Sequence, residues 1–123
     1  MPGLSETIRV RSILGRFLEH SRFYIFDAGG RRTFLLGSAD LMPRNLDHRI
    51  EVLAPVEDGR AQQDLLRAFD VLLADNASAW EMSSEGRWMK LRPKKGDRGR
   101  QAQQVFMRSA RARARRRAAS GSR

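Results

Sequence analysis

The sequence has no cysteine, which excludes disulfide bonds, thiolate metal ligands and cysteine nucleophiles. Histidine is scarce, with only His20 and His48, so a metal site built from the histidines of one chain is not expected. No apolar run approaches the roughly eighteen residues that a membrane span needs. The first residues lack the basic-then-apolar pattern of a secretory signal, and these features together predict a cytoplasmic protein.

Acidic residues are nearly missing from the last third of the chain. Residues 1–86 carry ten arginines and thirteen acidic residues, whereas residues 87–123 carry fourteen Lys or Arg and one Asp. The formal net charge of +10 therefore arises entirely in the last third. This asymmetry predicts a near-neutral globular body followed by a basic arm whose partner is an anion.

The first half of the chain divides into a helix, strands and loops. Apolar residues at helical spacing predict a helix over residues 10–19. A glycine-containing hairpin loop is expected over residues 28–32, and a loop or single helical turn over residues 38–45. Aromatic and β-branched runs predict three strands, over residues 22–27, 33–37 and 49–55.

The second half contains the most regular apolar stripe, which predicts a helix over residues 59–75. The remaining segments are predicted as a hairpin, a charged linker, a basic helix and a disordered end, over residues 80–91, 93–99, 101–118 and 120–123. The element order indicates a mixed α/β (α+β) domain over residues 1–92. Residues 93–123 are expected to add a basic linker, helix and tail.

The segment from His20 to Asp27 has the pattern His-x-basic-x4-Asp. Alternate residues of a strand share a face, so His20 and Arg22 are expected to point at one phosphoryl group. There the imidazole can act as nucleophile or acid, and the guanidinium can bind phosphate oxygens. Asp27 lies at the other end of the strand and is expected to bind backbone or orient a neighbour. A lone histidine at such a junction is also typical of a structural hydrogen bond.

A second motif, Gly37-Ser38-Ala39-Asp40, follows the expected hairpin. The two motifs resemble those of the phospholipase D superfamily, with Arg22 in place of the usual Lys and Asp40 in place of the usual Asn. Ser38 is expected to donate a hydrogen bond to a phosphoryl oxygen, and Asp40 to fix the tautomer of His20. Taken alone, the second motif is equally typical of a turn after a strand.

Two longer runs, Arg16–Arg22 and Gly37–Leu53, resemble the C-terminal domain of bacterial polyphosphate kinase, and the arginine-rich end resembles actinobacterial versions. The resemblance implies a phospholipase D-like half domain, with a small mixed sheet flanked by helices and a C-terminal basic helix. It implies reversible transfer of the ATP γ-phosphoryl group to inorganic polyphosphate. It also implies Mg²⁺, with ligands outside this chain.

The resemblance also implies roles for individual residues. His20 matches the histidine that contacts ATP and assists transfer as acid or base, and it is not the histidine that becomes phosphorylated. Asp27 is implied as structural support. The residues implied to bind ATP or phosphate are His20, Arg22, Ser38, Asp40, Arg44 and Asn45.

In the family, the phosphorylated histidine belongs to a first half that this sequence does not contain. We therefore expect this polypeptide to be inactive alone and to need the N-terminal portion of the enzyme or a second copy as partner. Two alternatives stay open. One is a dimeric phospholipase D-type phosphodiesterase or nuclease. The other is a non-enzymatic module that binds nucleic acid or polyphosphate through the basic residues 90–117.

Overall fold

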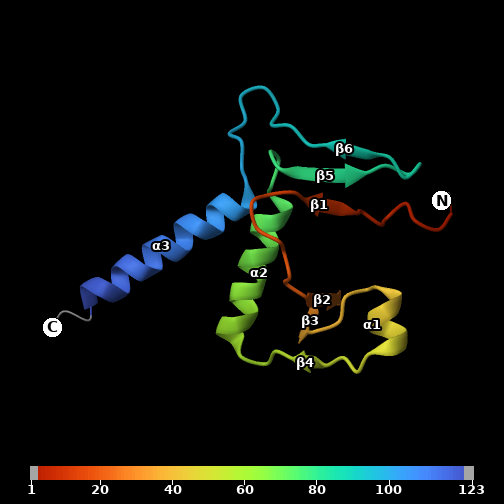
Figure 1. Ribbon diagram of the computed structural model, residues 1–123, viewed down its shortest axis with the longest axis horizontal. Helices are drawn as coiled ribbons and strands as arrows, with labels where there is room; N and C mark the ends of the chain where they lie inside the picture. Colours follow the sequence, from red (N-terminus) through yellow and green to blue (C-terminus); the bar gives the residue numbers. More distant parts are fainter. Residues whose placement is uncertain (1–2, 121–123) are drawn as a thin grey trace. The chain divides into compact units, whose positions relative to one another are not determined.

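The computed structural model describes residues 3–120, and Figure 1 shows its helices and strands. The chain divides into two compact units. The first unit combines the residues up to Leu18 with those from Asp70 onward, and the second unit runs from Glu19 to Phe69. The strands form two antiparallel sheets of three strands each, where the sequence predicted one small mixed sheet. Helices accompany both sheets, which confirms the mixed α/β class.

The second unit is built on a sheet with the strand order β2-β3-β4. β2 covers Phe23–Ala28 and β3 covers Arg31–Gly37, with Phe23 opposite Leu36. The turn between them is formed by Gly29 and Gly30, whose φ angles are 59° and 83°. A two-residue hairpin turn needs this left-handed backbone, and glycine adopts it without steric cost. The predicted hairpin is therefore confirmed, with a shorter loop than expected.

The third strand of this sheet, β4, covers only Leu53–Pro55, although the sequence predicted a strand from residue 49. The backbone of Val52 bonds to Ser38 instead of continuing a regular ladder. The Ser38 N–H donates to the Val52 carbonyl at 3.1 Å, and the Val52 N–H donates to the Ser38 hydroxyl at 3.2 Å. The short helix α1, Pro43–His48, supplies the helical turn expected in the polar stretch before it.

The helix α2, Gly59–Leu73, confirms the helix predicted from its apolar stripe. It begins after Asp58, whose carboxylate accepts the Ala61 N–H at 2.8 Å, as an N-cap residue does. Its Phe69 ring packs edge-on to Phe23, with the ring centroids 6.4 Å apart. Phe34, on β3, is buried in the same unit, so aromatic residues contribute much of its small core.

The sheet of the first unit has the strand order β1-β5-β6 (Figure 1). β1 covers Arg11–Ile13, β5 covers Ala79–Met82 and β6 covers Trp88–Lys90. β5 and β6 form the predicted C-terminal hairpin, and its connecting turn contains Gly86 with φ of 77°.

The helix predicted over residues 10–19 is wrong, because the structure has the strand β1 there and no regular element from residue 14 to residue 22. β1 pairs with β5, with Ile13 opposite Ala79. The apolar side chains that suggested a helix do not share a buried face, since Leu14, Phe17 and Leu18 are 62%, 50% and 83% exposed. Strand pairing therefore overrode a helical spacing that had no surface to cover.

The helix α3, Ala102–Ser120, confirms the predicted basic helix, and the charged linker over residues 93–99 has no regular structure. The expected disordered end covers residues 120–123. Ser120 belongs to α3, and the rest of that segment lies outside the described residues. No helix within residues 3–120 combines the length and the apolar character that crossing a membrane requires.

Candidate functional site

His20 and Arg22 lie immediately before β2, in the second unit, rather than on a strand. The hydrogen bonding of the hairpin nevertheless extends to this point, because the Gly37 N–H donates to the Arg22 carbonyl at 3.1 Å. This bond holds the backbone of Arg22 beside the Gly37–Asp40 segment. The hairpin thus brings together the two motifs that the sequence analysis singled out.

Arg22 and Asp40 form a two-pronged ion pair at the end of the hairpin. Arg22 Nε donates to Asp40 Oδ1 at 2.5 Å, and Arg22 Nη2 donates to Asp40 Oδ2 at 2.8 Å. The side chains are 23% and 32% exposed. The hydrogen bond from Arg22, aided by the charges of Arg22 and Arg44, holds the pKa of Asp40 below its usual value. Asp40 correspondingly raises the pKa of Arg22, so the pair stays ionised.

His20 is exposed and contacts the same guanidinium, with its Nδ1 3.2 Å from Arg22 Nη2. A guanidinium has N–H donors and no acceptor, so Nδ1 must be the acceptor in this contact. The neutral ring then carries its hydrogen on Nε2, which leaves Nε2–H available as a donor. The sequence predicted that Asp40 would fix the tautomer of His20. In the structure Arg22 touches the ring, and Asp40 orients Arg22.

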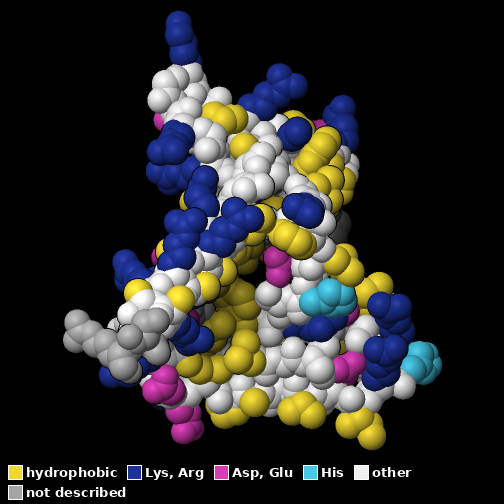
Figure 2. Space-filling view, turned by 60° about the vertical axis from the view of Figure 1, so that its left-hand side comes forward, with side chains coloured by type: hydrophobic (Ala, Val, Ile, Leu, Met, Phe, Trp, Pro, Cys, Tyr) yellow, Lys and Arg dark blue, Asp and Glu magenta, His cyan; other side chains and the backbone are white. Residues whose placement is uncertain are grey.

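Figure 2 shows histidine side chains, in cyan, on the surface beside Lys and Arg side chains. Arg44 is exposed at the start of α1 and lies close enough for its charge to lower the pKa of Asp40. Asp27 lies away from this group at the turn end of the hairpin, where it accepts a hydrogen bond from Arg32 Nε at 2.7 Å. Both members of that pair are about half exposed, 50% for Asp27 and 51% for Arg32. Asp27 thus braces the hairpin, and Arg44 belongs to the charged group.

Ser38 and Asn45 are held together by Glu51. The Ser38 hydroxyl donates to one carboxylate oxygen of Glu51, and Asn45 Nδ2 donates to the other at 2.8 Å. These two hydrogen bonds hold the pKa of Glu51 below its usual value. Asn45 is only 3% exposed, and its Oδ1 atom has no hydrogen-bond partner within the described residues. Ser38 and Asn45 therefore fix the loop around α1 in this structure.

Glu51 is a residue that the sequence analysis did not assign to the site. The available signal was a single carboxylate between the apolar residues Ile50 and Val52 in a segment predicted as a strand. A charged residue at such a position needs a polar partner if it turns inward. For Glu51 that partner is Ser38, which lies on the other side of the loop. The hairpin brings the two residues together, so their spacing in the sequence did not reveal the contact.

Gly37 allows β3 and β4 to approach closely beside the site. A Cβ added at Gly37 would stand 2.8 Å from the Val52 carbonyl oxygen and would also collide with a methyl group of Leu53. The Leu53 side chain can turn away, but the backbone oxygen cannot move without separating the strands.

We expect Gly37→Ala to lower the free energy of unfolding by about 1–3 kcal/mol, because of this overpacking. Urea unfolding of the whole chain measures the effect. The matched control is Gly59→Ala, since a Cβ at Gly59 meets no atom within 4 Å. Equal stability of the two variants would contradict the close approach.

The residues of this group do not fit a bound magnesium ion. Mg²⁺ prefers carboxylate oxygens that are free to coordinate it. Here both oxygens of Asp40 are held by Arg22, and both oxygens of Glu51 are held by Ser38 and Asn45. Within residues 3–120, no three His, Asp or Glu side chains gather in a way that could hold a metal ion. We therefore assign no metal ligand to the described part of the chain.

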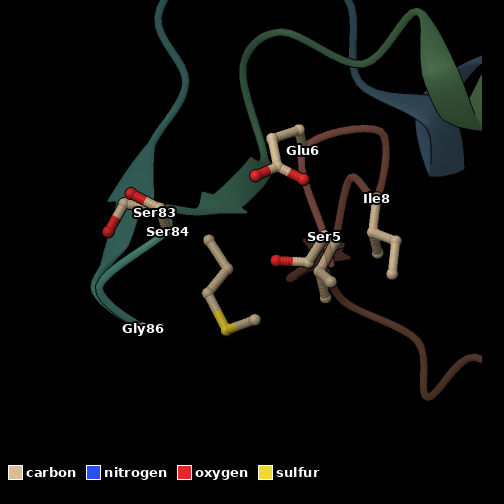
Figure 3. Close-up of a pocket in the computed structure, with 8 residues that line it drawn as sticks. Ser5, Glu6, Ile8, Ser83, Ser84 and Gly86 are labelled. Carbon is tan, nitrogen blue, oxygen red and sulfur yellow. The ribbon is translucent and has the colours of Figure 1, made fainter. Parts of the chain in front are cut away.

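A separate pocket lies in the first unit and has a volume of about 490 Å³. Figure 3 shows Ser5, Glu6 and Ile8 from the N-terminal segment on one side and Ser83, Ser84 and Gly86 from the β5–β6 turn on the other. Among the described residues, its lining includes no histidine, lysine or arginine, and none of the predicted site residues. This pocket therefore offers a phosphate no guanidinium, ammonium or imidazole group from the described residues.

Comparison with known proteins identifies the relatives of this chain. The family profile "Polyphosphate kinase C-terminal domain 2" matches residues 1–104. The polyphosphate kinase of Prosthecochloris aestuarii is 51% identical over 89 residues, which cover 72% of this chain and 12% of that protein. The polyphosphate kinase of Thermosynechococcus vestitus is 43% identical over 107 residues, which cover 87% of this chain and 15% of that protein.

Solved structures give the same result. The crystal structure of polyphosphate kinase from Porphyromonas gingivalis superposes with a TM-score of 0.79 and 30% identity, over 88% of this chain and 16% of that one. The chain thus spans between 12% and 16% of the length of these relatives. The family profile, the sequence relatives and the structural match agree, and the chain belongs to the polyphosphate kinase family, within its C-terminal domain.

Proposed function

We propose that residues 19–69 supply one face of a site that transfers a phosphoryl group between ATP and inorganic polyphosphate. The observation that carries this proposal is the Asp40–Arg22–His20 arrangement, in which one guanidinium joins the two family motifs. The proposal is further supported by the names of the relatives, which are polyphosphate kinases. ATP and polyphosphate are accordingly the proposed substrates.

Arg22 retains N–H groups for a phosphate. A guanidinium has five N–H donors. Asp40 accepts from Nε and Nη2, and His20 accepts from Nη2, so Nη1 has no partner within the described residues. Nη1 is the atom that would bind an oxygen of the transferring phosphoryl group, where a positive charge neutralises the negative charge of the transition state. Arg44 would add charge at the same end of the hairpin.

His20 would act as a hydrogen-bond donor through Nε2–H. A ring whose Nδ1 accepts from Arg22 cannot take a proton at Nε2, because Nε2 already carries one. It can donate a hydrogen bond to an oxygen that gains negative charge during transfer, as a preorganised donor does. This role differs from the acid or base role that the resemblance implied, and it follows from the Arg22 contact.

One face of such a site does not complete an in-line transfer, in which attacking and leaving oxygens lie on opposite sides of the phosphorus. We therefore propose that the remainder of a polyphosphate kinase, or a second copy of this chain, supplies the opposite side. The 123-residue polypeptide alone is expected to make no polyphosphate.

A chimera tests the proposed function directly. The matching segment of the polyphosphate kinase of Streptomyces coelicolor, which is 50% identical over 88 residues, would be replaced by the sequence of this chain. We expect the chimera to synthesise polyphosphate from ATP at a rate within about tenfold of the parent enzyme, since a tenfold change corresponds to only about 1.4 kcal/mol. The measurement is ATP-dependent formation of polyphosphate.

The control chimera carries the corresponding segment of the Prosthecochloris aestuarii enzyme, which is similarly related to this chain. If that control is active while a folded chimera with the present sequence is inactive, the proposed function is wrong.

A further inference from the structure

The helix α3 consists of a docked part and a projecting part. In the docked part, Ala102 is buried, and its N–H donates to Asp75 Oδ2 at 2.8 Å. Gln103 bonds to both backbone groups of Phe17, accepting from its N–H at 3.0 Å and donating to its carbonyl at 2.7 Å. Val105, Phe106 and Met107 are half-buried. The beginning of α3 is thus fixed to the first unit at several points.

The projecting part begins at Arg108, and every residue from there to Ser120 is exposed. It carries six arginines, and α3 contains no acidic residue. Among residues 3–120, no acidic side chain forms an ion pair with any of these arginines. Figure 2 shows the dark-blue basic side chains along this helix. We call this group the arginine arm; it consists of Arg108, Arg111, Arg113, Arg115, Arg116 and Arg117.

The spacing of the arginine arm places like charges next to each other. Residues three or four apart are neighbours on a helix, and like charges at that spacing destabilise it. Such pairs occur at Arg108 and Arg111, at Arg111 and Arg115, and at Arg113 and Arg117. Nothing within the described residues neutralises them. A bound polyanion would neutralise them and would therefore favour the helical form of the arm.

We propose that the arginine arm is a second binding site for inorganic polyphosphate, outside the phosphoryl-transfer face; the choice of this ligand rests on the proposed function. Guanidinium groups bind phosphate oxygens through paired N–H donors. Each residue of an α-helix is turned by about 100° from the one before it. Arg108, Arg111 and Arg115 therefore share one side of α3, and Arg113, Arg116 and Arg117 share the opposite side. A flexible chain of phosphates can contact either stripe.

Polyphosphate fits the arm better than single-stranded nucleic acid does. Proteins that bind single strands stack the bases on aromatic side chains as well as binding phosphates. The only aromatic residue of α3 is Phe106, which is half-buried in the docked part, and residues 107–120 contain none. The arm thus offers many phosphate contacts and no stacking surface. Its attachment to the same polypeptide would raise the local concentration of polymer for the proposed reaction.

The test measures binding of the 123-residue chain to inorganic polyphosphate at several salt concentrations. In the arm variant, three arginines of one stripe become glutamine, which preserves helix propensity: Arg108→Gln, Arg111→Gln and Arg115→Gln. The control variant removes three positive charges from exposed arginines elsewhere: Arg9→Gln, Arg60→Gln and Arg92→Gln.

We expect the arm variant to bind polyphosphate at least about tenfold more weakly than the control variant. For a single-stranded polyanion, each lost phosphate contact makes the slope of log affinity against log salt concentration less negative by about 0.7. With three contacts removed, the slope measured for the arm variant should be less negative by about 2 than the slope of the wild-type chain. Far-UV circular dichroism of the wild-type chain should show more helix when polyphosphate is added.

Equal weakening of the arm and control variants would overturn the proposal, because binding would then depend on net charge alone. Tighter binding of single-stranded RNA than of polyphosphate at equal phosphate concentration would assign the arm to nucleic acid instead. These binding results are independent of the chimera's activity, so each proposal can fail without the other.

Discussion

Asp75→Ala is expected to lower the free energy of unfolding of the chain by at least about 3 kcal/mol, more than any other single substitution considered for stability. Asp75 is 1% exposed and lies just after α2. Its Oδ1 atom accepts the backbone N–H groups of Ala77, Ser78 and Ala79 at 3.1, 2.7 and 3.0 Å. Alanine would leave these donors, one buried and two partly buried, without that partner.

The second oxygen of Asp75 joins distant parts of the first unit. Asp75 Oδ2 accepts the Ser78 hydroxyl at 2.5 Å and the N–H of Ala102, the first residue of α3, at 2.8 Å. The backbone carbonyl of Asp75 also accepts a hydrogen bond from Arg11 Nη2, at 2.8 Å, on β1. One carboxylate therefore fixes the turn before β5 and caps the beginning of α3.

Three variants distinguish this role from a general loss of charge. Asp75→Asn keeps an acceptor for the turn but presents an amide to the Ala102 N–H, so we expect an intermediate loss of stability. Asp97→Ala removes the same charge from an exposed loop and should change the free energy of unfolding by less than about 0.5 kcal/mol. Urea unfolding measures all three. Stability of Asp75→Ala within error of Asp97→Ala would contradict the central role of this carboxylate.

The contribution of Asp75 should depend on pH. Burial raises the pKa of Asp75, but hydrogen bonds from Ser78 and from the backbone of Ala102, Ser78 and Ala77 outweigh burial and hold the pKa below its ordinary value. A lowered pKa in the folded state means that the stabilisation is present above the ordinary carboxyl pKa of about 3.9 and is lost as the pH falls through the lower folded value. The wild-type chain should therefore lose its larger free energy of unfolding, relative to Asp75→Asn, as the pH falls below about 4.

Local signals in the sequence predicted much of the fold. The Gly29-Gly30 pair between aromatic and β-branched runs predicted the hairpin, because two-residue turns need positive φ. The apolar stripe in residues 59–75 predicted α2, because a stripe on one face defines an amphipathic helix. Each signal lies within one continuous stretch of the sequence and needs no knowledge of the rest of the molecule.

The errors arose where distant segments decide the structure. Val10, Ile13 and Leu14 fit a helical spacing, but residues 11–13 pair with β5, which lies more than sixty residues further along the chain. The role of Asp75 likewise depends on Ala102, which lies 27 residues further along the chain, beyond the β5–β6 hairpin. The sequence Asp75-Asn76-Ala77-Ser78 signals a turn closed by a side chain, but spacing alone does not reveal the second bond to α3.

The site was predicted as a set of residues, whereas its connections came from the structure. His20, Arg22 and Asp40 were expected together from the order of the two motifs, and the hairpin brings them together. Which nitrogen of His20 accepts from Arg22 was not predictable, because it depends on how the ring is oriented. The choice of Nδ1 changes the chemistry proposed for the histidine.

His20→Ala in the chimera is expected to lower kcat by about 10²–10³, the usual cost of removing one preorganised donor to a developing negative charge. His20→Gln should recover at least about tenfold of that loss, because the glutamine amide can place an N–H near the position of Nε2. A group that donates a hydrogen bond can be replaced in this way, whereas a group that accepts and returns a proton cannot. The control is His48→Ala, which alters the other, exposed histidine at the end of α1 and should leave kcat unchanged.

The comparison of glutamine with alanine decides between the two roles of His20. Equal loss of kcat in His20→Gln and His20→Ala would contradict hydrogen-bond donation and return the residue to acid or base catalysis. A loss in His48→Ala as large as that in His20→Ala would remove His20 from the site altogether. The Arg22 contact predicts recovery by glutamine, because the guanidinium donates to Nδ1 and leaves Nε2–H as the only polar group of the ring that can face a phosphate.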